Sequence, residues 1–181
     1  MTKTLYEEEK LLYSKIGKRK RKMELELEVK IDAGILYDYM LHHTYGSFQG
    51  VIGTAIGALM IVGFAATQYV VWLIGGLVLL AYLPWSLFLK SRQQMANTPA
   101  FREPLHYRIT EQGVEISQGQ IKEFQAWEQM YKASSTGKSI ILYTSKVNAS
   151  IFPRKDLREK EVALIEMISK HMDTKRVKIK A

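Results

Sequence analysis

The first clear pattern in the chain is an alternation of apolar and charged residues in MELELEVKID, residues 23–32. A period of two places every second side chain on the same face of a strand. The sequence therefore predicts a strand with one buried face, formed by Leu25, Leu27, Val29 and Ile31. Over residues 32–45 the apolar spacing becomes helical, which predicts a helix leading into the next segment.

Residues 47–89 form a run of 43 residues without a charged side chain. A helix needs roughly 20 apolar residues to cross the hydrocarbon core of a bilayer. The run therefore predicts two membrane crossings, at residues 48–66 and 70–89, joined by a tight turn at 67–69. A bent hairpin buried inside a soluble protein is the alternative. A cleaved signal peptide is disfavoured because the run starts deep in the chain and is too long.

Basic residues flank this run on both sides. The block KRKRK occupies residues 18–22, and Lys90 and Arg92 directly follow the second crossing. Positively charged flanks stay on the cytoplasmic side of a membrane, so both termini are predicted to be cytoplasmic. Residues 1–22 are predicted to form a polar and basic lead to this anchor.

Small residues occur at helical spacing in the first crossing. Gly53 and Gly57 are four positions apart, a spacing that lets two helix backbones approach closely. They are candidate helix-packing residues, either between the two crossings or between two copies in a homodimer. No ionisable residue lies within either crossing, whereas transporters usually carry such groups at membrane depth. Transport is therefore disfavoured, and a small oligomeric channel or an accessory subunit of a membrane transport complex stays as the alternative.

After the hairpin, short strand patterns follow one another: LHYRIT, VEIS, KEFQAW, EQMYKA, SIILYTS and ASIFP. Turn residues separate several of them, which predicts an antiparallel meander rather than alternating strands and helices. Over residues 157–172 apolar positions recur at helical spacing and predict an amphipathic closing helix of about four turns.

The predicted fold class is an α+β membrane protein. A two-helix transmembrane hairpin is inserted into a small antiparallel β-sheet or barrel of the pleckstrin-homology (PH) type, which a C-terminal amphipathic helix caps. The predicted divisions are the lead at 1–22, the first strand and helix at 23–46, the hairpin at 47–89, the cytoplasmic domain at 90–172 and a basic tail at 173–181. We expect the tail to be disordered, like many chain termini.

The segment ASSTGKS, residues 133–139, ends like the phosphate-binding loop G-x-x-x-x-G-K-[ST]. However, Lys132 occupies the position of the first glycine, and strand patterns flank the segment on both sides. We therefore predict a hairpin turn at residues 134–138, with Gly137 available for a positive φ, and no nucleotide site.

The 181-residue chain contains no cysteine, which excludes disulfides and thiolate metal ligands. His42 and His43 are adjacent and have no third ligand nearby in sequence, so a place at the membrane interface is favoured over metal binding. Trp127, on a predicted strand, is expected in the core rather than in a ligand-stacking site. The sequence shows no acid–base or nucleophile constellation. We therefore expect no enzyme, no cofactor and no nucleic-acid partner.

The formal net charge is +8, and 17 of the 26 basic residues follow the hairpin. Eight of them are candidates for contact with the membrane or a partner: Arg154, Lys155, Arg158, Lys160, Lys175, Arg176, Lys178 and Lys180. For the first four, a solvated helix start is favoured over such a contact. A tethered basic domain meets anionic headgroups at high effective concentration, so even weak contacts can orient it.

Four segments after the hairpin carry a family resemblance: YRITEQGVEI at residues 107–116, FQAW at 124–127, IILYT at 140–144 and IFPRKDL at 151–157. In their order and spacing the chain resembles the YcxB-like proteins of bacteria, over roughly residues 23–172. The resemblance implies a bacterial membrane protein with a membrane-anchored, PH-like domain, and it brings no catalytic residues. The lead at 1–22 is not part of the pattern.

These observations favour an integral protein of the bacterial inner membrane. Its two crossings would hold a cytoplasmic interaction domain that binds a protein or anionic lipid headgroups. A channel or transport component is the alternative stated above.

Overall fold

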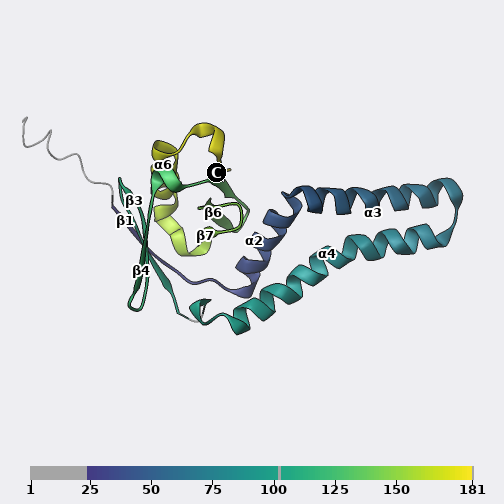
Figure 1. Cartoon of the computed structure of the whole chain (residues 1–181), viewed down its shortest axis with the longest axis horizontal. Helices are drawn as coiled ribbons and strands as arrows, with labels where there is room; N and C mark the ends of the chain where they lie inside the picture. The colour runs from purple at the N-terminus through teal and green to yellow at the C-terminus, as the bar shows by residue number, and fades with distance from the viewer. Residues whose placement is uncertain (1–23, 102, 181) are drawn as a thin grey trace, which may run out of the picture.

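The chain is described from a computed structural model, which covers residues 24–101 and 103–180. The predicted lead at residues 1–22 lies outside the described residues. Figure 1 shows a domain of strands and short helices, from which two long helices project side by side.

Four antiparallel strands form the first sheet, in the order β1 (Leu25–Val29), β2 (Leu105–Ile109), β3 (Gly113–Gln118) and β4 (Ile121–Ala126). β1 pairs with β2 although the whole helical segment separates them in the sequence. Leu27 and Val29 are buried, whereas Glu26 and Glu28 are exposed, which confirms the alternation predicted for the first strand.

Three helices connect β1 to β2: α2 (Ala33–Tyr45), α3 (Phe48–Thr67) and α4 (Val70–Asn97). Asp32 caps α2, because its Oδ1 accepts a hydrogen bond from the Ile35 N–H at 2.8 Å. Ser47 caps α3 in the same way through the Gly50 N–H. α4 extends eight residues past the predicted end at Leu89. This helix of the hairpin therefore continues into the domain.

Helices α3 and α4 are long and apolar enough to cross a membrane. Their apolar side chains are largely uncovered within the described chain, with Phe48 81% and Val71 79% exposed. Soluble monomers rarely leave apolar patches of this size open to water. A hairpin buried inside a soluble domain is therefore not what the structure shows.

The two long helices pack closely at a pair of glycines, Gly57 on α3 and Gly76 on α4. A Cβ atom added to Gly57 would lie 2.8 Å from the Leu80 side chain, and one added to Gly76 would lie 2.9 Å from the Gly57 carbonyl oxygen. A Cβ on Gly53 would make an ordinary contact of 3.7 Å with Leu83. The structure thus places Gly57 at the contact between the two helices of one chain.

The strands after β4 form a second sheet, and the single antiparallel meander predicted above is wrong. The order is β7 (Ala149–Pro153), β6 (Ser139–Tyr143), β5 (Lys132–Ser135) and β8 (Val177–Lys178), and β8 is parallel to β5. EQMYKA is not one strand, because the chain passes between the sheets through a 3-10 turn at Trp127–Gln129. The Trp127 indole N–H donates to the Thr110 carbonyl at 2.9 Å and holds this turn against the first sheet.

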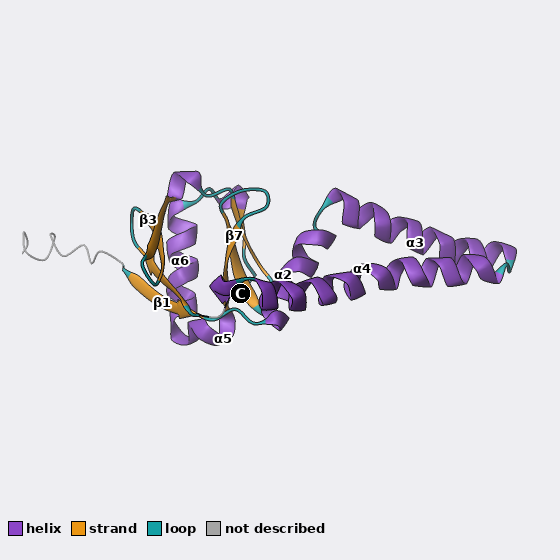
Figure 2. Ribbon diagram, turned by 60° about the horizontal axis from the view of Figure 1, so that its bottom comes forward, coloured by secondary structure: helices purple, strands orange, loops and turns teal. Residues whose placement is uncertain are grey.

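The closing helix is shorter than predicted. Residues 157–172 contain the end of α5 (Arg154–Leu157), a 3-10 turn at Arg158–Lys160, and α6 (Glu161–His171). Arg158 has a φ of 48°, which breaks the helical path, and Leu157 is buried before the break. α6 buries Leu164, Met167 and Ile168 in a core shared with both sheets (Figure 2).

The basic tail is ordered between residues 173 and 180, so the expectation of disorder is wrong. Val177–Lys178 extends the second sheet as β8, and the Arg176 guanidinium donates to the Met130 carbonyl at 3.0 Å. The Lys180 N–H donates to Ser135 Oγ at 2.8 Å. The tail is ordered because it pairs with a strand that is distant in the sequence. Without the tail, β5 would be an unpaired edge of the second sheet.

The ASSTGKS segment forms a strand and a turn. Ser134 and Ser135 belong to β5, so the turn is shorter than the predicted 134–138. Thr136 Oγ1 accepts from the N–H groups of Lys138 and Ser139 at 3.1 and 3.0 Å. Gly137 does not have a positive φ, contrary to the prediction, because the Thr136 hydroxyl stabilises the turn without a left-handed residue.

Candidate functional site

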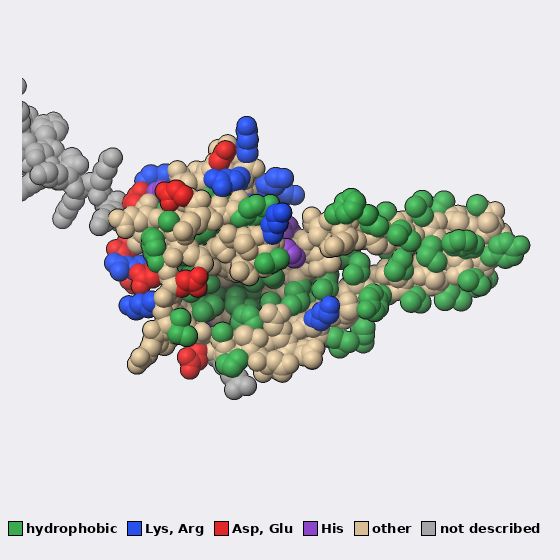
Figure 3. All heavy atoms as spheres, in the orientation of Figure 1, with side chains coloured by type: hydrophobic (Ala, Val, Ile, Leu, Met, Phe, Trp, Pro, Cys, Tyr) green, Lys and Arg blue, Asp and Glu red, His purple; other side chains and the backbone are tan. Residues whose placement is uncertain are grey.

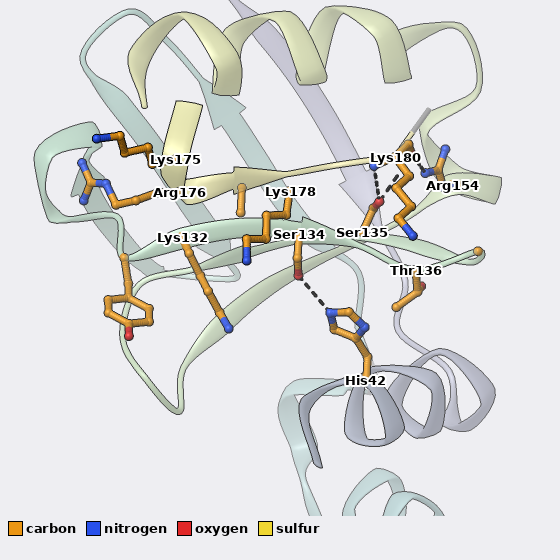
Figure 4. A pocket seen from close by; sticks show the side chains of 13 residues that line it. His42, Lys132, Ser134, Ser135, Thr136, Arg154, Lys175, Arg176, Lys178 and Lys180 are labelled. Atoms are coloured by element: carbon orange, nitrogen blue, oxygen red, sulfur yellow. Dashed lines mark hydrogen bonds between the residues drawn. The ribbon is translucent and has the colours of Figure 1, made fainter. Parts of the chain in front are cut away.

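A groove of about 990 Å³ lies between the edge of the second sheet and the last turn of α2. β5 and β8 form one wall, and His42 of α2 faces them from the other side (Figure 4). The wall exists because the tail pairs with β5, which brings the residues around 133–135 next to those around 177–180.

Among the described residues, six basic and no acidic side chains line the groove: Lys132, Arg154, Lys175, Arg176, Lys178 and Lys180. Arg154 forms an ion pair with Glu161, and its other amino group donates to the Lys180 carbonyl at 2.6 Å. Among the described residues, the four lysines form no ion pair with a carboxylate. Lys132 Nζ instead lies 4.5 Å from the centre of the Tyr143 ring. The groove therefore carries a positive charge that the protein leaves largely uncompensated.

Polar groups form the floor of the groove. His42 Nε2 lies 3.2 Å from Ser134 Oγ, and this hydroxyl also interacts with the buried Tyr143. Burial lowers the pKa of His42 below its ordinary value of 6.5, and the charge of Lys132 lowers it further, while Asp38 acts in the opposite direction. The neutral imidazole is therefore favoured at neutral pH, and one of its nitrogens can act as a hydrogen-bond donor.

His43 has a different environment from its neighbour. Its ring stacks against those of Tyr39 and Tyr143, with centroids 5.8 and 6.1 Å away. Among the described residues, no group of three or more His, Cys, Asp or Glu side chains is arranged to hold a metal ion. His43 thus has a packing role between α2 and β6.

The eight predicted cations separate into two groups. Five of them line the groove: Arg154, Lys175, Arg176, Lys178 and Lys180. Lys155, Arg158 and Lys160 lie elsewhere, beside β1 and α5, where acidic residues also occur. Lys155 pairs with Asp32 at 2.5 Å, and Lys160 donates to the Glu26 carbonyl at 2.8 Å. The first contact attaches α5 to the start of α2, and the second attaches the 3-10 turn that follows α5 to β1.

Sequence reasoning missed Lys132, and it did not connect His42 with the basic residues. Both are recognisable only once β5 is placed next to β8 and α2. The pair His42–Ser134 is separated by 92 residues, and Ser135–Lys180 by 45. No local motif carries such information.

The Trp127 ring is buried and stacks on His171, with ring centroids 5.1 Å apart. His171 Nε2 lies 3.0 Å from a Glu111 carboxylate oxygen, which also accepts from Lys170. Lys170 and His171 lower the pKa of Glu111. This cluster fixes α6 to the β2–β3 turn and leaves the indole face unavailable for a ligand.

Residues 109–168, from the end of β2 into α6, match the family model described as YcxB-like protein. The match covers about a third of the chain and confirms the resemblance inferred from the sequence over this segment. No curated protein and no solved structure matches the chain.

Proposed function

We propose that this chain is an integral protein of the bacterial inner membrane that presents a PH-like interaction domain to the cytoplasm. Its hairpin crosses the bilayer twice, and the basic groove of the domain binds an anionic partner. The observation that carries the proposal is the position of the groove, because its residue His42 lies only six positions before the uncovered apolar hairpin begins at Phe48. Figure 3 shows basic side chains on the domain near its junction with the hairpin.

The hairpin supports the anchoring part of the proposal. α3 and α4 expose apolar side chains along their length, and the turn between them at Gln68 and Tyr69 carries no charge. Lys90 and Arg92 follow the apolar part of α4 on the domain side. Basic flanks of this kind remain cytoplasmic, which supports a cytoplasmic domain.

The domain supports the interaction part. Two small sheets packed with one closing helix agree with a PH-like architecture, although such a shape does not by itself define a ligand. The groove concentrates cations on one face. His42 and Ser134 are within hydrogen-bond distance, but among the described residues no carboxylate forms a hydrogen bond with His42 to complete a relay. We therefore assign binding rather than catalysis to the groove.

Single-cysteine labelling tests the proposal, since the natural chain has no cysteine background. Tyr69→Cys marks the turn of the hairpin, and Gly137→Cys marks the rim of the groove, where an added Cβ meets no atom within 4 Å. In intact spheroplasts an impermeant maleimide should label position 69 and spare position 137. After lysis both should react. Labelling of position 137 before lysis would overturn the cytoplasmic placement.

A further inference from the structure

We infer that the groove binds the phosphomonoester headgroup of a lipid from the same bilayer that holds the hairpin. The inference rests on the proposed function, because only an anchored domain brings the groove to the headgroup layer. The positive charge of the groove alone would suit many anions, and the inference specifies one class of ligand among them.

The charge of the groove favours a dianion over a monoanion. Lys178 projects from β8, Lys180 from the residues that follow it and Lys132 from β5. None of the three has a carboxylate partner among the described residues. A phosphomonoester carries a charge of about −1.5 to −2 at neutral pH and offers three acceptor oxygens. A phosphodiester offers a single negative charge and two free oxygens, so it would leave more of the lysine charge unmatched.

The floor supplies the shorter-range contacts. Ser134 is the register partner of Lys178, and its Oγ lies 3.2 Å from His42 Nε2 of the facing helix (Figure 4). Their mutual hydrogen bond uses one of the two protons, so either the Ser134 hydroxyl or the His42 N–H is left to donate to a phosphate oxygen that the lysines attract. Ser135 is not free for this purpose, because its hydroxyl bonds to the main chain of Lys180.

The distance to the hairpin favours a lipid over a soluble phosphate compound. His42 precedes the first residue of α3, Phe48, by six positions, which is roughly 10 Å along the chain at helical rise. The polar headgroup layer on each side of a bilayer is about 5–8 Å deep. A headgroup whose acyl chains stay in the bilayer therefore comes within reach of the groove at the start of α3.

Calorimetric titration of the full-length protein in a neutral detergent tests the inference. The three probes are dihexanoyl phosphatidic acid, dihexanoyl phosphatidylglycerol and inorganic phosphate. The test variant is Lys178→Gln with Lys180→Gln, which keeps the main-chain bonds of the tail. The control variant is Lys122→Gln with Lys146→Gln, an equal change of charge at exposed sites away from the groove. Thermal unfolding of each variant shows whether its fold is intact.

Phosphatidic acid should bind more tightly than either other probe, and the groove variant should bind it at least about tenfold more weakly. The control variant should bind it like the natural chain. Equal affinity for phosphatidylglycerol would overturn the monoester assignment, and equal affinity for inorganic phosphate would overturn the lipid assignment. If both double variants lost the same affinity for phosphatidic acid, general surface charge would explain the binding, and the groove would not be the binding site. Because these titrations do not depend on orientation, their failure is distinct from a failure of the labelling experiment.

Discussion

The Thr136 hydroxyl accounts for the turn that resembles a phosphate-binding loop. It accepts from two backbone N–H groups and donates to Asp38 Oδ2 at 2.5 Å, which joins the turn to α2. Thr136→Val keeps the shape and removes these bonds, so the free energy of unfolding should fall by roughly 1–3 kcal/mol. Thermal unfolding in detergent measures the change.

Lys138→Ala is the control for this prediction, because the exposed Lys138 side chain makes no contact that the turn requires. It should unfold like the natural chain. Saturable ATP binding that this substitution abolishes would show that the segment is a nucleotide site after all.

His42 predicts a pH dependence of headgroup binding. Its pKa is lowered in the free protein by burial and by Lys132, and a bound anion favours its protonated form. Binding of the anion should therefore raise the His42 pKa, and protonation should strengthen binding as the pH falls through that raised value. Asp38 raises the His42 pKa and His43 lowers it, and both residues are present in the free and in the anion-bound protein.

His42→Gln isolates this effect from the titration of the phosphate itself. The ratio of the affinities of the natural chain and the variant should grow about tenfold as the pH is lowered from 8 toward 5, which corresponds to one pKa unit of coupling. Titrations with dihexanoyl phosphatidic acid across this range measure it. A constant ratio would place His42 outside the binding site.

Tyr107 predicts the response of the domain to alkaline pH. Burial raises its pKa to about 12 from an ordinary value of 10.0, while a hydrogen bond with Ser150 lowers it slightly. A raised folded-state pKa means that the stabilisation is complete below about pH 10 and is lost as the pH rises toward 12. The loss should amount to roughly 2–3 kcal/mol.

The check is the free energy of unfolding as a function of pH for the natural chain and for Tyr107→Phe. The variant should show a shallower alkaline decline. Tyr131→Phe, at an exposed position, is the matched control and should follow the natural chain. Parallel curves for the natural chain and Tyr107→Phe would contradict the assignment.

At the scale of elements, the α3–α4 contact depends on the absence of a side chain at Gly76. A methyl group there would meet the Gly57 carbonyl oxygen, which belongs to the backbone and cannot turn aside. Gly76→Ala should destabilise the hairpin by roughly 1–3 kcal/mol through overpacking. Gly53→Ala, with ordinary contacts only, should be tolerated. Denaturation titrations in mixed micelles compare the two. A larger effect at Gly53 would point to a contact between copies of the chain.

The sequence predicted those elements whose signal is local. Residues 47–89 predict two apolar helices because the lack of charge extends over the whole run, and the structure has helices at Phe48–Thr67 and Val70–Asn97. The β1 alternation is local in the same sense. The shortened closing helix was missed because no Gly or Pro marks the break at Arg158, where the backbone has a φ of 48°.

The sequence predicted the charge of the groove but not which cations line it, because that depends on contacts between distant residues. The basic character of residues 154–180 is visible in the sequence, but the division of these cations between two faces is not. Lys155 forms an ion pair with Asp32, which is 123 positions away in the sequence, whereas the pairing of β8 with β5 places Lys178 beside Ser134. Strand pairing across such distances is set by the whole core and not by the residues near the site.

At the scale of the whole molecule, two helices join the domain to the hairpin. α2 packs on α4, and the Tyr37 and Phe88 rings meet edge to face at 5.7 Å. α4 continues without interruption from the apolar segment into the domain, and Ser91 is buried at this junction. The orientation of the domain relative to the hairpin is therefore set by helix packing.

This arrangement predicts which face of the domain lies nearest the membrane. Gly137 lines the groove, whereas Lys122 lies on β4, in the sheet farther from the hairpin in Figures 1 and 2. Fluorophores on Gly137→Cys and Lys122→Cys, in nanodiscs with headgroup spin-labelled lipid, should be quenched strongly and weakly, respectively. The difference should persist in about 1 M salt, where the Debye length falls to about 3 Å and exposed charge contacts are screened. Equal quenching at both positions would show that the domain turns freely, and a difference that salt abolishes would show that charge rather than helix packing orients it.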